Sequence, residues 1–148
     1  MKCKELQIGD WIQDKNGNPM RIIKVGKDYA CATSGDNECP WAFEDDGDHP
    51  EGIPLTKEML DANGFRYEKD YGPFYHSILG GYHCKPDYCT CVEYKETSAG
   101  RKICYIDCQN REYGKESSVT IRTEFYVHTL QHALRLIGLS EIADNFKI

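Results

Sequence analysis

The C-terminal residues 126–148 constrain the fold more than any other part of this 148-residue chain. Large aliphatic residues recur there at the spacing of one face of an α-helix. This stripe consists of Val127, Leu130, Leu134 and Ile137, widened by Ala133 and Leu136. Gly138 follows where a helix ends on a left-handed residue, and Ser140 is suited to capping a last turn through Asp144. We expect a helix whose apolar stripe packs on a neighbouring sheet.

The first third of the chain has the pattern of short strands joined by tight turns. The turn signal Lys-Asn-Gly-Asn-Pro at 15–19 separates the apolar run at 20–25 from an expected strand at 6–13, which a turn-forming Gly9-Asp10 breaks. A Gly-Lys-Asp turn then leads to a strand at 29–33. Residues 41–44 are expected to add a strand that closes a small SH3-like β-barrel, which is an analogy of pattern and carries no function.

A short helix is expected at 57–63, because both of its ends are encoded in the sequence. Thr56 is suited to accept a hydrogen bond from a free backbone N–H at the N-terminus. Gly64 stands where the helix needs a left-handed residue, and Phe65 is expected to fold back on Leu60.

Alternating apolar and polar residues between 74 and 127 predict an antiparallel meander of about four strands. The expected strands lie at 74–79, 90–95, 102–108 and 118–125. The sequence therefore predicts an α+β protein with two parts. An SH3-like barrel subdomain that includes the short helix covers 1–67, and an antiparallel sheet packed by the C-terminal helix covers 68–148.

Composition and charge narrow the possible partners. The apolar fraction of 40% is typical of a globular protein, and neither a membrane span nor a signal peptide is visible, so we expect a cytoplasmic protein without membrane contact. The net charge is −6, and residues 34–52 hold seven acids and no Lys or Arg. Direct nucleic-acid binding is therefore disfavoured. We interpret the acidic stretch, which includes Asp45, Asp46 and Asp48, as a solvated loop, with a cation site or charge mimicry of nucleic acid as alternatives.

The densest cysteine group lies around a turn-like Pro-Asp pair at 86–87. A hairpin there would place Cys84 opposite Cys89, with Cys91 on the same strand face as Cys89. Together with His83, these residues are candidate zinc ligands; a redox-dependent disulfide and plain thiols remain the alternatives.

Two further patterns are weaker signals of a functional site. Cys104 and Cys108 are too far apart on one strand to share an ion or a disulfide, and we expect them on one sheet face. His128 and His132 have metal-ligand spacing on the predicted helix, but Thr129 stands where a zinc protease has its glutamate. We interpret these histidines as a polar or half-buried helix face, with a metal site as the alternative. The chain shows neither a phosphate-binding loop nor a nucleophile elbow, which favours a binding protein over an enzyme.

Three segments carry a resemblance to a known family: the opening at 4–12 with Gly-Asn-Pro-Met at 17–20, the middle at 53–65, and the ending at 126–136. They resemble a family of small uncharacterised proteins that gut Bacteroidetes encode, often within prophages and other mobile elements. The resemblance implies an intracellular accessory protein of mobile DNA, and it assigns no catalytic or binding residues.

We therefore expect a non-enzymatic accessory or interaction protein of phage type. It would bind a host protein, or a small ligand between barrel and sheet, and some of its ten tyrosines are candidate contacts. Three alternatives remain open: a zinc-stabilised binding module built on His83, Cys84, Cys89 and Cys91, a small Cys/His enzyme, and an acidic antagonist of a DNA-binding host protein.

Overall fold

Helices and strands are combined in two compact units, which confirms the expected α+β class. The computed structural model describes residues 2–35, 41–44, 47, 50–68, 81–83, 88–96, 102–110, 117–123 and 126–148. Within these residues, side chains are described in 2–35, 41–44, 47, 50–65 and 126–148. The first unit comprises Met1–Pro54 and Tyr126–His128, and the second comprises Leu55–Phe125 and Thr129–Ile148.

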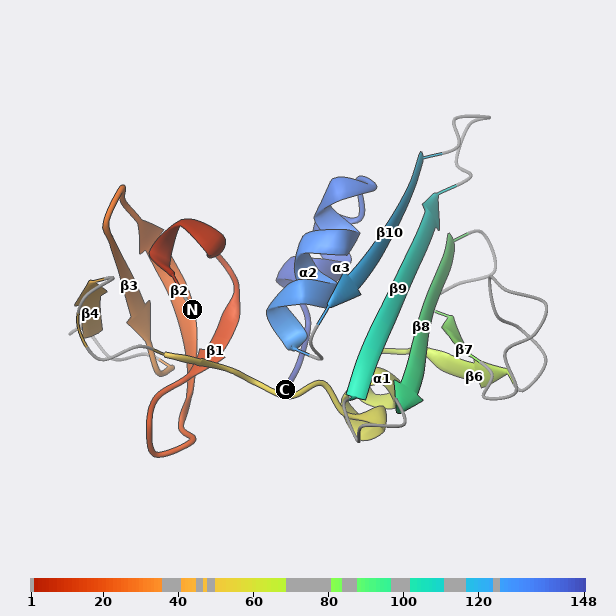
Figure 1. The fold of residues 1–148 in the computed structure, drawn as a ribbon, viewed down its shortest axis with the longest axis horizontal. Helices are drawn as coiled ribbons and strands as arrows, with labels where there is room; N and C mark the ends of the chain where they lie inside the picture. Colours follow the sequence, from red (N-terminus) through yellow and green to blue (C-terminus); the bar gives the residue numbers. More distant parts are fainter. Residues whose placement is uncertain are drawn as a thin grey trace. The chain divides into compact units, whose positions relative to one another are not determined.

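The first unit contains a curled antiparallel sheet with the strand order β4-β3-β2-β1-β5 (Figure 1). Its elements are the 3-10 helix η1 (Cys3–Glu5) and the strands β1 (Trp11–Gln13), β2 (Pro19–Val25), β3 (Tyr29–Thr33), β4 (Trp41–Glu44) and β5 (Glu51–Gly52). The strands expected at 20–25, 29–33 and 41–44 are confirmed. The turn expected at Gly9-Asp10 is confirmed, but the strand expected before it is wrong, since only Trp11–Gln13 of the segment at 6–13 forms a strand.

A glycine-dependent turn shortens that strand. The N–H of Asp10 donates to the carbonyl of Gln7 at 3.1 Å, and Gly9 has a φ of +90°, which favours glycine. Gly9 then donates to Ile22 at 2.8 Å, and the N–H of Ile22 donates to the carbonyl of Asp10 at 2.9 Å. Two residues therefore stand opposite one, which is a β-bulge with glycine at its first position. The buried Asp10 carboxylate closes the turn by accepting the N–H of Gln7 at 2.7 Å.

The inner face of this sheet is a continuous apolar core. Alternate residues of neighbouring strands are buried there, and η1 and the residue after it contribute Cys3 and Leu6. The cluster consists of Cys3, Leu6, Ile12, Met20, Ile22, Ala30, Ala32 and Phe43, with Val25 and Trp41 partly buried against it. Burying each large aliphatic side chain contributes about 1.5–3 kcal/mol, so this face accounts for the packing of the first unit.

The second unit contains two antiparallel sheets. Strands β6 (Arg66–Glu68) and β7 (Gly81–His83) form a pair, and β8 (Tyr88–Glu96), β9 (Lys102–Asn110) and β10 (Ser117–Thr123) form a three-stranded sheet in the order β10-β9-β8. The strands expected at 90–95 and 102–108 are confirmed, and the one expected at 118–125 is confirmed through Thr123. The strand expected at 74–79 lies outside the described residues.

The register of the three-stranded sheet aligns apolar positions across it. Directly opposite residues share a face. Val92, Ile106 and Ile121 form one row of partners across the three strands. Two residues before Ile106 on β9, Cys104 stands opposite Thr123 of β10. Two residues after Ile106, Cys108 stands opposite Val119. The expectation that these cysteines share a sheet face is therefore confirmed.

Helix α1 (Lys57–Ala62) has the two ends that the sequence predicts. The hydroxyl of Thr56 accepts the N–H of Met59 at 3.2 Å. Gly64 has a φ of +79°, and the N–H of Phe65 donates to the carbonyl of Leu60 at 3.0 Å. The N–H of Gly64 also donates to the carbonyl of Asp61 at 3.0 Å, so the helix ends in a Schellman motif, and Leu60 and Phe65 are both buried.

Helix α2 (Val127–Leu136) has the expected apolar stripe, with one exception. Val127, Leu130, Ala133, Leu134 and Ile137 are all buried. Leu136 is 67% exposed, so its expected place in the stripe is wrong. At about 100° per residue, Leu136 lies roughly 200° around the helix from Leu134 and faces away from the stripe.

A last short helix, α3 (Ser140–Asp144), follows Gly138, and Figure 1 draws α2 and α3 beside the three-stranded sheet. The expected cap by Ser140 is wrong, because Ser140 is the first helical residue and Leu139 occupies the N-cap without a side-chain hydrogen bond. Contacts with α2 hold this turn in place. Gln131 donates to the carbonyl of Ala143 at 2.8 Å, and Arg135 forms an ion pair with Asp144 at 2.9 Å.

The C-terminal residues are fastened to the end of α1. The side-chain amide of Asn63 donates to the carbonyl of Lys147 and accepts its N–H, both at 2.7 Å. Beside this clamp, the rings of Phe65 and Phe146 meet edge to face, with centroids 6.5 Å apart. The tail is therefore held by a paired hydrogen bond and an aromatic contact.

The chain re-enters the first unit at Tyr126. Pro54 and Tyr126 form an isolated antiparallel bridge, and the N–H of Val127 donates to the carbonyl of Ile53 at 2.9 Å. The Tyr126 ring lies directly over Gly52, where an added Cβ would come within 2.5 Å of two ring carbons. Glycine at 52 is therefore required by the close approach of this ring.

We expect Gly52→Ala to lower the free energy of unfolding by about 1–3 kcal/mol, because either the strand or the Tyr126 ring must move. Urea denaturation followed by circular dichroism measures the loss. Gly47→Ala is the matched control, since a Cβ there would have its nearest neighbour at 3.6 Å. The penalty should shrink in a Tyr126→Ala background. Equal losses at Gly47 and Gly52 would contradict this reading.

Candidate functional site

The predicted zinc cluster falls where the structure describes the backbone but not the side chains. His83 is the last residue of β7 and pairs with Arg66 of β6. Cys89 and Cys91 belong to β8, where they stand opposite Gln109 and Asp107. Cys84 and the expected turn at 86–87 lie outside the described residues.

The register adds one residue to this group. Cys89 and Cys91 are two apart on β8 and share a face of the sheet. Asp107, directly opposite Cys91, shares that face too. Sequence reasoning missed Asp107, because no local signal shows which residues of two strands stand opposite each other.

Of the two helical histidines, His128 makes an aromatic contact. The imidazole of His128 stacks on the ring of Tyr126, with centroids 5.5 Å apart and an interplanar angle of 13°. His132 lies one turn further along α2 and is half-buried. Among the side chains that the structure describes, no three His, Cys, Asp or Glu residues are grouped so that they could hold a metal ion.

An exposed surface on the outer side of the five-stranded sheet emerges only from the structure. The pairing of β2 with β3 shifts register between Ile22 and Lys24, so Ile23 is an extra, bulged residue. Ile23 is 44% exposed, Ile8 in the preceding turn is 64% exposed, and Tyr29 at the start of β3 is 37% exposed. We call Ile8, Ile23, Lys24 and Tyr29 the bulge surface.

Cations lie over aromatic rings on this side of the sheet. The Lys24 ammonium is 5.5 Å from the centroid of the Tyr29 ring, and the Arg21 guanidinium carbon is 5.9 Å from that of Trp11. A hydrogen bond to the Tyr29 side chain, followed by attraction to its charge, raises the pKa of Lys24 above 10.5. Gly26 allows this arrangement, since any Cβ there would overlap the Tyr29 ring.

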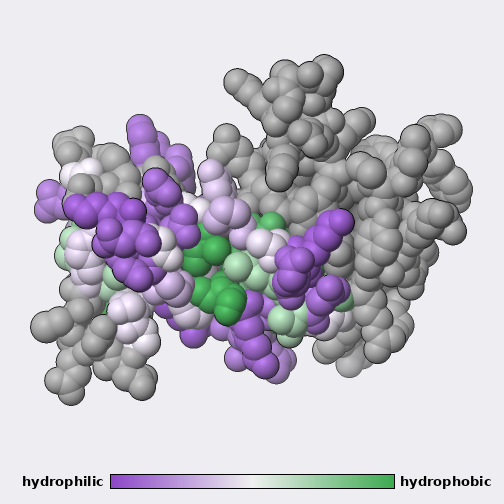
Figure 2. Space-filling view, turned by 90° about the horizontal axis from the view of Figure 1, so that it is seen from below, coloured by the Kyte–Doolittle hydropathy of each residue, from purple (hydrophilic) through white to green (hydrophobic). Residues whose placement is uncertain are grey.

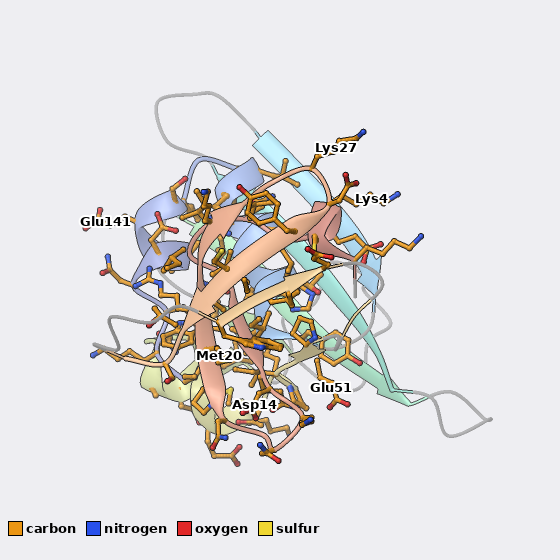
Figure 3. The ribbon with its side chains drawn as sticks, turned by 90° about the vertical axis from the view of Figure 1, so that its left-hand side faces the viewer. Lys4, Asp14, Met20, Lys27, Glu51 and Glu141 are labelled. Atoms are coloured by element: carbon orange, nitrogen blue, oxygen red, sulfur yellow. The ribbon has the colours of Figure 1, made fainter. Side chains whose placement is uncertain are left out.

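Charged residues lie at both ends of the first unit, and Lys4 and Lys27 are each followed in the chain by an exposed acid, Glu5 and Asp28. Figure 3 shows Lys4 and Lys27 at one end, and Asp14 and Glu51 at the opposite end. Hydrophilic residues cover much of the described surface in the view of Figure 2. Of the acidic stretch, Asp45, Asp46 and Asp48 lie outside the described residues.

The chain matches no known family model, no curated protein and no solved structure. Within the described part of the chain, no helix has both the length and the apolar character needed to cross a membrane.

We expect Tyr29→Phe to lower the pKa of Lys24 toward 10.5, because the variant keeps the ring but loses the hydroxyl. A folded-state pKa raised above the unfolded value adds stability that is fully present below pH 10.5 and is lost as pH rises through the folded value. An NMR titration of the Lys24 side chain measures the change. Tyr126→Phe is the control, since that ring packs on Gly52. An unchanged Lys24 titration in Tyr29→Phe would refute the assignment.

Proposed function

We propose that this chain is a non-enzymatic accessory protein of a phage or mobile element that binds a host protein. The binding face would be the outer side of the five-stranded sheet. We propose that this sheet forms an SH3-like barrel. One observation carries the proposal: this side presents the Trp11–Arg21 and Tyr29–Lys24 pairs, while the inner side is filled by the core. Tyr, Trp and Arg are the residues that protein interfaces favour and that dominate their binding energy.

The resemblance of the segments at 4–12, 53–65 and 126–136 supports the biological setting, which is the cytoplasm of a gut Bacteroidetes host. The outer side of a curled sheet is convex, which suits a protein partner better than a small molecule, because small ligands are held in concave pockets. A small ligand therefore remains the secondary occupant.

Affinity capture from a lysate of such a host, followed by mass spectrometry, tests the proposal. We expect the wild-type chain to enrich a specific host protein and Arg21→Glu to lose it, because the reversal removes the cation over Trp11. Lys15→Glu makes the same charge change in the β1–β2 turn and should retain the partner. A wild-type chain that enriches nothing beyond an unrelated control protein refutes the proposed function.

A second candidate is a zinc-stabilised binding module, and the register of β8 and β9 favours it. Cys89 and Cys91 share one sheet face with Asp107, which gives three residues of metal-binding type within two rows of the sheet. Thiolate and carboxylate are both zinc ligands, and His83 ends a strand of the same unit.

Metal analysis of protein purified without a histidine tag tests this candidate. We expect about one zinc per chain, because a structural site binds its metal tightly. Cys89→Ser with Cys91→Ser should remove the metal, whereas Cys31→Ser in β3 should retain it. Zinc below about one-tenth of an equivalent would eliminate the candidate.

A further inference from the structure

The bulge in β2 brings an aliphatic and a cationic side chain to the surface together. In a regular strand, successive residues face opposite sides, so Ile22 and Lys24 would both point inward. The extra residue, Ile23, shifts this alternation by one position. As a result, Ile22 is buried, Ile23 and Lys24 are both exposed, and Val25 is again partly buried against the core.

The glycine turn adds a second aliphatic residue at the same place. Gly9 donates its N–H to the carbonyl of Ile22 at 2.8 Å. Ile8 precedes Gly9 in the chain, and Ile23 follows Ile22. The two exposed isoleucines therefore lie on neighbouring segments that are joined by this hydrogen bond. Tyr29, which holds Lys24 over its ring, extends the exposed apolar area.

The charge around this surface is positive, although the whole chain is acidic. Outside the β1–β2 turn, residues 2–29 include five Lys or Arg and three Asp or Glu, and one of these acids, Asp10, is fully buried. Lys24 belongs to the surface itself, and Lys4 and Lys27 lie together at one end of the unit (Figure 3). Two exposed acids adjoin Tyr29: Asp28 precedes it in the chain, and Glu44 of β4 pairs with it in the register.

We infer that the bulge surface binds an acidic peptide segment that also carries bulky apolar side chains. Carboxylates of the segment would pair with Lys24 and the neighbouring lysines, and its apolar side chains would cover Ile8 and Ile23. The inference deepens the proposed function and rests on it, because it specifies the chemistry of the host protein's docking segment.

Other anionic partners fit these residues less well. Nucleic-acid bases are bound by stacking on aromatic or guanidinium planes, whereas the bulge surface offers one ring, Tyr29, which Lys24 already covers. An anionic membrane needs a cluster of several cations beside a larger apolar face. A protein segment can match two isoleucines and a few lysines residue by residue.

The test is an NMR titration of the full ¹⁵N-labelled chain with a short synthetic peptide that combines Glu and Asp with Leu and Phe. The comparison peptide has Lys at every acidic position. We expect saturable shifts of the Ile8, Ile23 and Lys24 amides with the acidic peptide alone. Ile8→Asp and Lys24→Glu should each weaken its binding about ten-fold.

Leu136→Glu is the matched control for the apolar change, because Leu136 is an equally exposed aliphatic residue on α2. Lys15→Glu is the control for the charge change. Both should bind the acidic peptide like the wild type. Ile8 lies in a surface turn and Lys24 lies on a strand. If one of the two variants fails to fold, peptide binding by the other variant still tests the inference.

Several results would overturn the inference: no shifts, shifts elsewhere, equal binding of the basic peptide, or bulge-surface shifts with a DNA duplex or anionic vesicles instead. Failure of the proposed function is distinguishable. A host protein that wild type captures and Ile8→Asp and Lys24→Glu both retain refutes the bulge surface alone, whereas capture of no host protein refutes the function itself.

Discussion

The chain leaves the first unit at Pro54 and returns to it at Tyr126. The rest of the architecture depends on the contact between these two segments. The Pro54–Tyr126 bridge and the 2.9 Å bond from Val127 to Ile53 close a long excursion of the chain that contains α1 and β6–β10. Closing a loop of this length costs entropy that grows only slowly with length, so a few good contacts can hold it. Gly52 allows one of them, since its missing side chain leaves room for the Tyr126 ring.

Two departures from regular strand geometry decide which residues of the first unit are buried and which are exposed. The turn at Gly9 and the extra residue Ile23 both interrupt pairing with β2, and both leave an isoleucine exposed. The same shift keeps Ile22 in the core. A regular strand could not have buried Ile22 and exposed Lys24, so the surface chemistry follows from backbone irregularities.

The candidate sites were predictable to different degrees. The cysteine group around residue 86 is visible in the sequence, but its partner Asp107 depends on the register of β8 with β9. The bulge surface was missed altogether, because Ile22 and Ile23 are identical residues with opposite burial and no local pattern separates them. The paired histidines of α2 were visible, but the stacking of His128 on Tyr126 was not.

The sequence by itself determined the elements whose signals act over a few residues: α1 between Thr56 and Gly64, the buried stripe of α2, and most strands. Helix caps and hydrophobic periods work through bonds three or four residues apart, so they can be read locally. Only the tertiary structure decided the strand register, the Gly52–Tyr126 contact and the clamp of Asn63 on Lys147. These join residues far apart in the chain, and their pairing is selected by packing and backbone hydrogen bonding in the whole fold.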